Sequence, residues 1–118
     1  MSQQVAEIGA AEWDEKVTRA AAPVVVVDFY STDCPPCEAL APRLEQVAAE
    51  YRGRVQVYKV FPQGHREKAV ELGVLGSPTL VFFQGGEEAG GRLTGAIRPA
   101  DIRRQLDALL ASPAPPSP

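Results

Sequence analysis

The chain has 118 residues, 45% of them hydrophobic, and 12 basic against 15 acidic side chains give a formal net charge of −3. This length suits one domain with a hydrophobic core and is too short for two. No basic block is present, and every apolar run is far shorter than the roughly 20 residues of a membrane span, so we expect neither nucleic acid nor a membrane as a partner. No basic segment followed by an apolar one opens the chain, which predicts an intracellular, cytoplasmic protein.

The N-terminal half of the chain predicts two strands, each followed by a helix. Trp13, Val17 and Ala20 recur at helical spacing. Four consecutive valines then open a strand, and such an unbroken apolar run favours a strand that is buried on both faces. The elements expected here are a strand over residues 4–8, a helix over 10–21, a strand over 24–30 and a helix from 34 or 36 to 51.

The C-terminal half predicts a further strand and helix, a β-hairpin and a last helix. Gly73 closes the first of these helices, and we expect His65 at its start to be solvated. Gly85 and Gly86 mark the hairpin turn, and two more glycines weaken the returning strand. The expected elements are a strand over residues 54–61, a helix over 65–72, strands over 79–83 and 88–95, and a helix over 99–110.

This order of elements predicts the fold class. Strands that alternate with helices, one of them buried on both faces, indicate a three-layer α/β/α domain with a central mixed five-stranded sheet and four helices. We assign residues 1–111 to this domain. Residues 112–118 contain four prolines and are expected to form an extended, disordered tail.

The segment Cys34-Pro35-Pro36-Cys37 holds both cysteines of the chain, directly after a buried strand and before a helix. A lone Cys-x-x-Cys in a protein without a secretory leader indicates a redox pair. A structural disulfide is the weaker reading, because the stabilisation grows with the length of the closed loop and this loop is very short. A zinc site is also poorly supported, since it needs about four ligands and the chain adds only His65.

With these features, residues 5–111 resemble the thioredoxin family. The matching stretches are Val27-Asp28-Phe29, Cys34-Pro35-Pro36-Cys37, Ala41-Pro42, Lys59, Gly76-Ser77-Pro78-Thr79-Leu80, Phe83 with Gly86, and Gly95-Ala96. The resemblance implies the thioredoxin fold and a protein-disulfide reductase that needs no cofactor beyond a redox-active Cys34–Cys37 disulfide. It also implies a cis peptide between Ser77 and Pro78, packed beside Cys34.

We predict that Cys34 is the attacking cysteine and Cys37 the resolving one. Cys34 comes first, at the N-terminus of a helix, where the helix dipole and free N–H groups favour a thiolate. Cys37 lies one helical turn further on and should be buried. Pro35 and Pro36 stiffen the loop and remove two backbone donors, so the Cys37 N–H is the expected local donor to the Cys34 sulfur.

Asp28 and Lys59 are the predicted supporting residues. Asp28 follows four valines in a central strand, so burial should raise its pKa. A carboxylate with a raised pKa near Cys37 can take its proton as a general base. The alternative is an Asp at the strand end that faces solvent. Lys59 on the neighbouring strand could pair with Asp28 and tune it, or be an ordinary surface charge.

The chain departs from the family at the positions expected to contact substrate. Asp33 stands where the family has a tryptophan, and its charge should disfavour the Cys34 thiolate. Ser77 replaces an apolar residue, so partner range and reduction potential should differ from those of a general thioredoxin. The predicted substrate-binding residues are Asp33, Pro35, Pro36, Val74, Ser77, Pro78, Gly95 and Ala96.

The expected function is reduction of protein disulfides by dithiol exchange. By family analogy, a separate flavin-dependent thioredoxin reductase would recharge a monomeric protein. Two alternatives stay open, a glutathione-linked glutaredoxin-like protein and a binding or chaperone module that keeps the fold without turnover. A metal or iron–sulfur site shared between two chains is a remote fourth reading.

Overall fold

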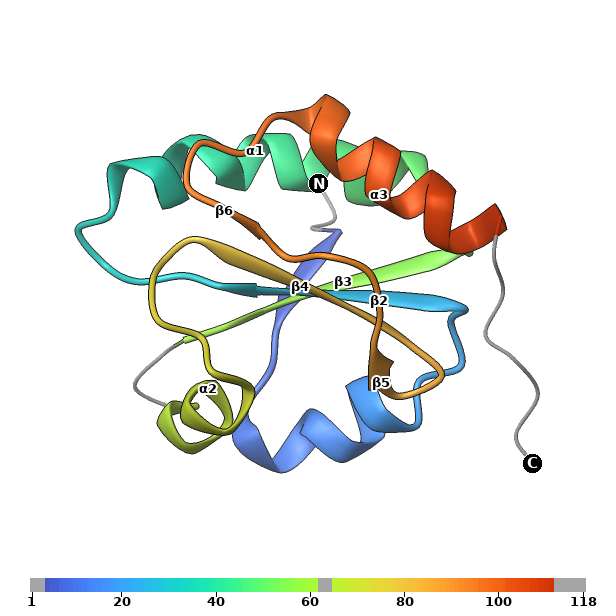
Figure 1. The fold of residues 1–118 in the computed structure, drawn as a ribbon, viewed down its shortest axis with the longest axis horizontal. Helices are drawn as coiled ribbons and strands as arrows, with labels where there is room; N and C mark the ends of the chain where they lie inside the picture. The colour runs from blue at the N-terminus through green and yellow to red at the C-terminus, as the bar shows by residue number, and fades with distance from the viewer. Residues whose placement is uncertain (1–3, 62–64, 112–118) are drawn as a thin grey trace.

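A computed structural model of the chain describes residues 4–61 and 65–111. Figure 1 shows a central sheet with helical segments above and below it. The elements, in chain order, are β1 (Val5–Glu7), the 3₁₀ turn η1 (Ala10–Glu12), the π-helical turn η2 (Asp14–Thr18), β2 (Val24–Phe29), α1 (Pro35–Glu50), β3 (Val55–Val60), α2 (Arg66–Leu72), β4 (Thr79–Gln84), β5 (Glu87–Glu88), β6 (Leu93–Thr94) and α3 (Pro99–Ala111).

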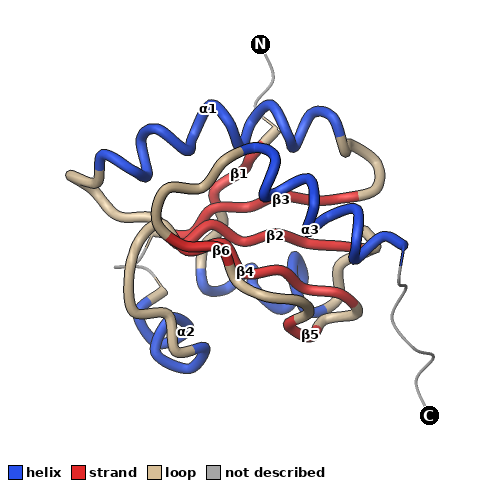
Figure 2. Tube along the Cα trace, turned by 45° about the horizontal axis from the view of Figure 1, so that its top comes forward, coloured by secondary structure: helices blue, strands red, loops and turns tan. Residues whose placement is uncertain are grey.

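The sheet is mixed, with strand order β1-β3-β2-β4-β5 and with β6 also paired to β4. Strands β1, β3 and β2 run parallel, whereas β4 is antiparallel to β2, β5 and β6. Strand β2 therefore lies in the middle of the sheet (Figure 2). The loop after β2 therefore begins at the carboxyl end of the central strand. Open α/β sheets form their sites at this end of the strands.

The valines of β2 supply both hydrophobic cores. All four are buried, and successive side chains of a strand point to opposite faces. Val24 and Val26 pack in the core under α1 and α3, together with Leu44 and Leu106. Val25 and Val27 pack in the opposite core, with the N-terminal helical turns and α2. The prediction of a strand buried on both faces, within a three-layer α/β domain, is confirmed.

Most observed boundaries lie within one residue of the predicted ones, and two elements differ by more. The first helix, expected over residues 10–21, is a 3₁₀ turn followed by a π-helical turn that ends at Thr18. The returning strand, expected as one segment over residues 88–95, is split into β5 and β6. Gly90 has a φ of +73°, which turns the chain out of the strand direction between the two pieces. The sheet accordingly has six strands.

His65 is buried, with 3% of its surface exposed, so the expectation of a solvated residue is wrong. Its ring lies 6.2 Å from that of Trp13 between centroids, because the start of α2 packs against the N-terminal helical turns. The tail predicted over residues 112–118 lies outside the described residues, and the domain boundary at residue 111 stays a prediction. Within residues 4–61 and 65–111, no helix is both long and apolar enough to span a membrane.

Candidate active site around Cys34 and Cys37

The two cysteines lie at the N-terminus of α1. Cys34 is the N-cap residue, in an extended conformation, and its sulfur accepts a hydrogen bond of 3.2 Å from the Cys37 N–H. Pro35 and Pro36 occupy the first helical positions, where a missing N–H costs nothing and the fixed φ suits the helix. The sulfurs are joined as a disulfide, with the Cα atoms 5.2 Å apart. The helix therefore begins at the redox pair.

The two cysteines are buried to the same degree in this disulfide state, 8% and 7% exposed. Exposure therefore does not separate an attacking from a resolving sulfur, although Cys37 was expected to be the more buried. The two cysteines differ in position, because Cys34 caps the helix whereas Cys37 is inside its first turn. Pro35 and Pro36 are exposed beside them.

The loop before β4 approaches the sulfur pair from the far end of the sequence. The Ser77–Pro78 peptide is cis. The carbonyl oxygen and the hydroxyl of Ser77 each lie 3.8 Å from the Cys34 sulfur. Pro78 is buried at the start of β4, while Ser77 is exposed. Backbone groups of Ser77 are thus next to Cys34, at the surface.

Asp28 lies behind the cysteine pair, on the face of β2 that α1 covers. It is 5% exposed, and among the described residues nothing hydrogen-bonds its Oδ1. Burial raises the pKa of Asp28 to about 7, against a smaller opposing effect of the Lys59 charge. Asp28, Asp33, Cys37 and Lys59 line one cavity of about 290 Å³. Burial therefore brings the pKa of this carboxyl group close to neutral pH, and the group shares a cavity with Cys37.

Lys59 is opposite Asp28 in the register of β2 and β3. It is half-buried, and its Nζ lies 5.8 Å from the ring centre of Tyr30. The Tyr30 hydroxyl donates a 2.5 Å hydrogen bond to Glu7, and burial raises the pKa of Tyr30 to about 12. Lys59 is thus held near Asp28 by its strand position and by an aromatic face.

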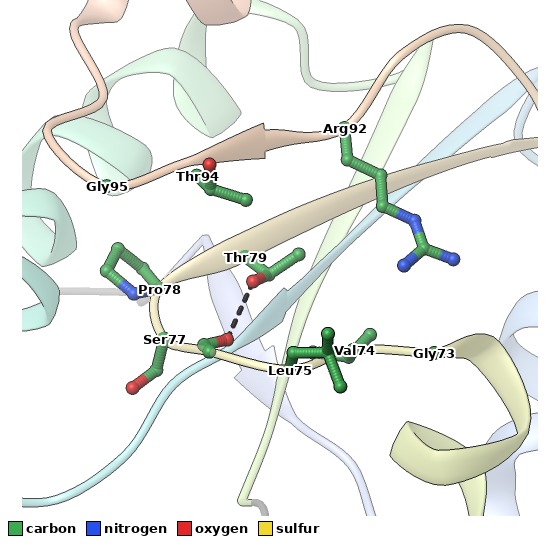
Figure 3. Close-up of a pocket in the computed structure, with 10 residues that line it drawn as sticks. Gly73, Val74, Leu75, Ser77, Pro78, Thr79, Arg92, Thr94 and Gly95 are labelled. Carbon is green, nitrogen blue, oxygen red and sulfur yellow. Dashed lines mark hydrogen bonds between the residues drawn. The ribbon is translucent and has the colours of Figure 1, made fainter.

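A second cavity, of about 430 Å³, opens on the other side of the cis peptide (Figure 3). Figure 3 shows the segment 73–77 along one side of it and the segment that carries Arg92 and Thr94 along the other. Leu75 is 99% exposed on this wall. Arg92 forms an ion pair of 2.7 Å with Glu88 and donates a hydrogen bond to the Leu72 carbonyl, which fixes the opposite wall.

The predicted substrate-binding residues fall on two sides of the sulfur pair. Asp33 lines the cavity behind Cys37, with a φ of +51°. Ala96 is exposed but does not line the cavity that holds Gly95. Four of the predicted substrate-binding residues are among those that line this second cavity: Val74, Ser77, Pro78 and Gly95.

Sequence reasoning missed Ser31, Leu75 and Arg92. The Ser31 hydroxyl lies 2.6 Å from the Ser77 hydroxyl, across 46 residues of sequence. No local pattern carries such a contact, because it depends on how two loops meet at the edge of the sheet. The full exposure of Leu75 likewise follows from the loop's path and not from its sequence. Among the described residues, no group of three or more His, Cys, Asp or Glu side chains could hold a metal ion.

A cysteine pair that caps a helix on a mixed sheet, with a buried carboxyl behind it and a cis X-Pro peptide beside it, defines a thioredoxin-like site. The thioredoxin family model matches residues 4–108. The chain belongs to the thioredoxin family. Membership and the bonded cysteine pair together support thiol–disulfide oxidoreductase activity.

Individual relatives agree with this membership. A thioredoxin of Pseudomonas aeruginosa is 32% identical over 108 residues, 92% of this chain and 98% of the relative. The chloroplastic M-type thioredoxin of Pisum sativum is 31% identical over 104 residues, 88% of this chain, which spans only 59% of that relative's length. A bifunctional thioredoxin reductase/thioredoxin of Mycobacterium leprae is 40% identical over 82 residues, 70% of this chain and 18% of that relative.

Proposed function

We propose that this chain reduces protein disulfides by dithiol exchange through Cys34 and Cys37. The observation that carries the proposal is the bonded cysteine pair at the N-terminus of α1, next to the exposed backbone of Ser77. A helix N-terminus favours a thiolate, and the Cys37 N–H already points at the Cys34 sulfur. Once the pair is reduced, the N-cap sulfur is the one placed to attack.

The proposed reaction transfers two electrons from the dithiol to the substrate. The Cys34 thiolate attacks one sulfur of the substrate disulfide, so a mixed disulfide forms and the first substrate thiolate leaves. The Cys37 thiolate then attacks the Cys34 sulfur and expels the second substrate thiolate. The protein ends as the Cys34–Cys37 disulfide and the substrate as a dithiol. The electrons come from the cysteines themselves, so the reaction needs no further cofactor.

Asp28 is proposed as the general base for Cys37. A carboxyl group with a pKa of about 7 is matched to proton transfer at neutral pH. The shared cavity is large enough for a water molecule to carry the proton between the two side chains. Lys59 tunes the base, because its positive charge lowers the pKa that burial raises.

An extended substrate segment is proposed to pair with the Ser77 backbone. Val74, Pro78 and Gly95 would contact it in the cavity beside the cis peptide, with Pro35, Pro36, Asp33 and Ala96 around the sulfurs. The exposed Leu75 adds an apolar contact on the same side. One chain carries the whole site, so a monomer suffices.

A flavin-dependent thioredoxin reductase is the proposed electron donor. The relative from Mycobacterium leprae, in whose name a reductase and a thioredoxin are joined, supports this pairing. A reductant of this type works where thiols are kept reduced, so we place the activity in the cytoplasm.

Insulin-disulfide reduction by the full chain, with thioredoxin reductase and NADPH, tests the proposal. The wild type should turn over, whereas Cys34→Ser should be inactive. Cys37→Ser should accumulate a mixed disulfide with the substrate, detectable by mass spectrometry, because the second attack is missing. Accumulation on Cys34→Ser instead would reverse the proposed roles.

The same assay distinguishes the alternative functions from the proposed one. Turnover with glutathione and glutathione reductase, but not with thioredoxin reductase, would indicate a glutaredoxin-like protein. A binding or chaperone module would show no turnover with either donor and would keep its cellular function as Cys34→Ser. A reduction potential near that of strong oxidants would overturn the direction of electron flow.

A further inference from the structure

Two serine hydroxyls form a connected pair that ends at the attacking sulfur. Ser31 follows β2 and Ser77 precedes β4, and their Oγ atoms lie 2.6 Å apart. The Ser77 Oγ lies 3.8 Å from the Cys34 sulfur, within reach of a hydroxyl donor. The three side chains therefore stand in the order Ser31, Ser77, Cys34.

Within residues 4–61 and 65–111, the Cys34 sulfur has few hydrogen-bond donors besides Ser77. Pro35 and Pro36 have no N–H, so the Cys37 N–H at 3.2 Å is the backbone donor in this turn. The Ser77 carbonyl oxygen, 3.8 Å from the sulfur, can only accept and so favours the protonated thiol. Among the described residues, the Ser77 hydroxyl is a second donor, beside the Cys37 N–H, that can favour the thiolate through a charge-assisted hydrogen bond.

The direction of the hydrogen bond between the two serines decides whether the Ser77 hydroxyl proton can be donated to Cys34. If Ser31 donates to Ser77, the Ser77 proton is left for Cys34; if Ser77 donates to Ser31, it is not. A negative charge on Cys34 selects the first arrangement, because each bond then polarises the next. Reduction of the disulfide creates that charge, so the pair should reorient when the protein is reduced.

We propose that the Ser31–Ser77 hydroxyl pair is a positioning element that stabilises the Cys34 thiolate and so makes the reduced protein easier to form. This inference rests on the proposed attack by Cys34. The serine pair supplies the donor that the two prolines remove, and it opposes the repulsion that the negative charge of Asp33 exerts.

The charged side chains near the sulfur pair lie on the Cys37 side of it. Asp28, Asp33, Glu38 and Lys59 line the cavity behind Cys37, which Ser31 also lines. Their charges persist in every serine variant, so they set a common background. A change in Cys34 that follows only the serine hydroxyls therefore cannot come from these groups.

The test uses a matched pair of substitutions at Ser77 in the full chain. Ser77→Thr keeps a hydroxyl, whereas Ser77→Val has nearly the same shape and none. The rate of Cys34 alkylation by iodoacetamide is followed against pH in each reduced protein, and the labelled cysteine is identified by mass spectrometry. The disulfide–dithiol equilibrium is measured separately in glutathione redox buffers.

In Ser77→Val the pKa of Cys34 should rise by about one unit, a tenfold loss of thiolate below that pKa, as expected for a hydrogen bond to a charged group. The equilibrium should shift toward the disulfide in the same variant. Ser77→Thr should stay close to the wild type. Equal titration curves for the valine, threonine and wild-type proteins would overturn the proposal.

Ser31→Ala tests the pairing. Alone, it should raise the pKa of Cys34 by less than Ser77→Val does, because it removes only the polarising second hydroxyl. In the Ser77→Val background it should have no effect, since its partner is already gone. An equal effect in both backgrounds would show that Ser31 acts independently and would refute the pairing. These readouts need no protein substrate, so they stand or fall separately from insulin reduction.

Discussion

Replacing Asp28 by Asn should make the folded protein more stable at neutral pH, because the wild type loses stability when this buried carboxyl group ionises. The carboxyl is 5% exposed and nothing among the described residues hydrogen-bonds its Oδ1, so its charged form is poorly solvated. Burial raises its pKa from 3.8 to about 7. At about 1.4 kcal/mol per pKa unit, this rise corresponds to about 4 kcal/mol of stability that ionisation removes.

The sign follows from proton binding. Between about pH 4 and pH 7 the folded state holds a proton that the unfolded chain has already lost, so the free energy of unfolding falls as the pH rises through this window. Above the folded-state pKa the penalty is complete and constant. The Asn side chain does not ionise, so its variant does not lose this stability. The free energy of unfolding of Asp28→Asn should exceed that of the wild type by an amount that grows across the window and reaches about 4 kcal/mol.

Urea unfolding of the oxidised proteins, at a series of pH values from about 4 to 8, measures this difference by linear extrapolation. Asp33→Asn is the matched control, because it makes the same chemical change at an exposed carboxylate in the loop that follows β2. It should keep the fall in stability that the wild type shows, because Asp28 is still present in this variant. A difference between Asp28→Asn and the wild type that is the same at every pH would refute the reasoning from burial.

Two further predictions concern a charge and a turn. Lys59→Met should move the fall of the stability curve to higher pH, because the Lys59 charge lowers the pKa of Asp28. Lys59→Arg keeps the charge and should leave the curve in place. Unchanged curves in both variants would show that Lys59 does not tune Asp28. Gly86→Ala should cost more than about 2 kcal/mol of unfolding free energy, since Gly86 has a φ of +85° and an added Cβ would lie 2.5 Å from the Thr18 carbonyl oxygen. Gly53→Ala, at a φ of +92° with open space around it, should cost only about 1 kcal/mol in urea unfolding, and equal losses at both positions would contradict the steric argument.

The sequence is most informative where one local pattern decides the structure. The four valines of β2 predict a strand with two buried faces, and each face is found in its own core. The placement of Cys34 at a helix N-terminus follows from the strand before it and the two prolines after it. In these cases, spacing along the chain and position in space are directly linked.

The failures arise where distant segments meet. The sequence predicts a solvated His65 at a helix start. The helix instead packs against Trp13, 52 positions earlier, and His65 is buried in this contact. The contact between Ser31 and Ser77 joins two loops that no periodicity relates. Two glycines predicted a weak returning strand, but only the positive φ of Gly90 shows where it breaks.

The cysteine pair sits at a single point on the edge of the sheet. Cys37 lines one cavity, and Ser77, whose carbonyl oxygen lies 3.8 Å from the Cys34 sulfur, lines the other. In the proposed reaction, the electron donor and the electron acceptor both reach the Cys34 sulfur, past the same Ser77 backbone. Two macromolecules cannot occupy that point together, so the protein has to release one partner before it meets the next. Steady-state rates should then follow ping-pong kinetics, with each partner acting as a competitive inhibitor of the other at high concentration.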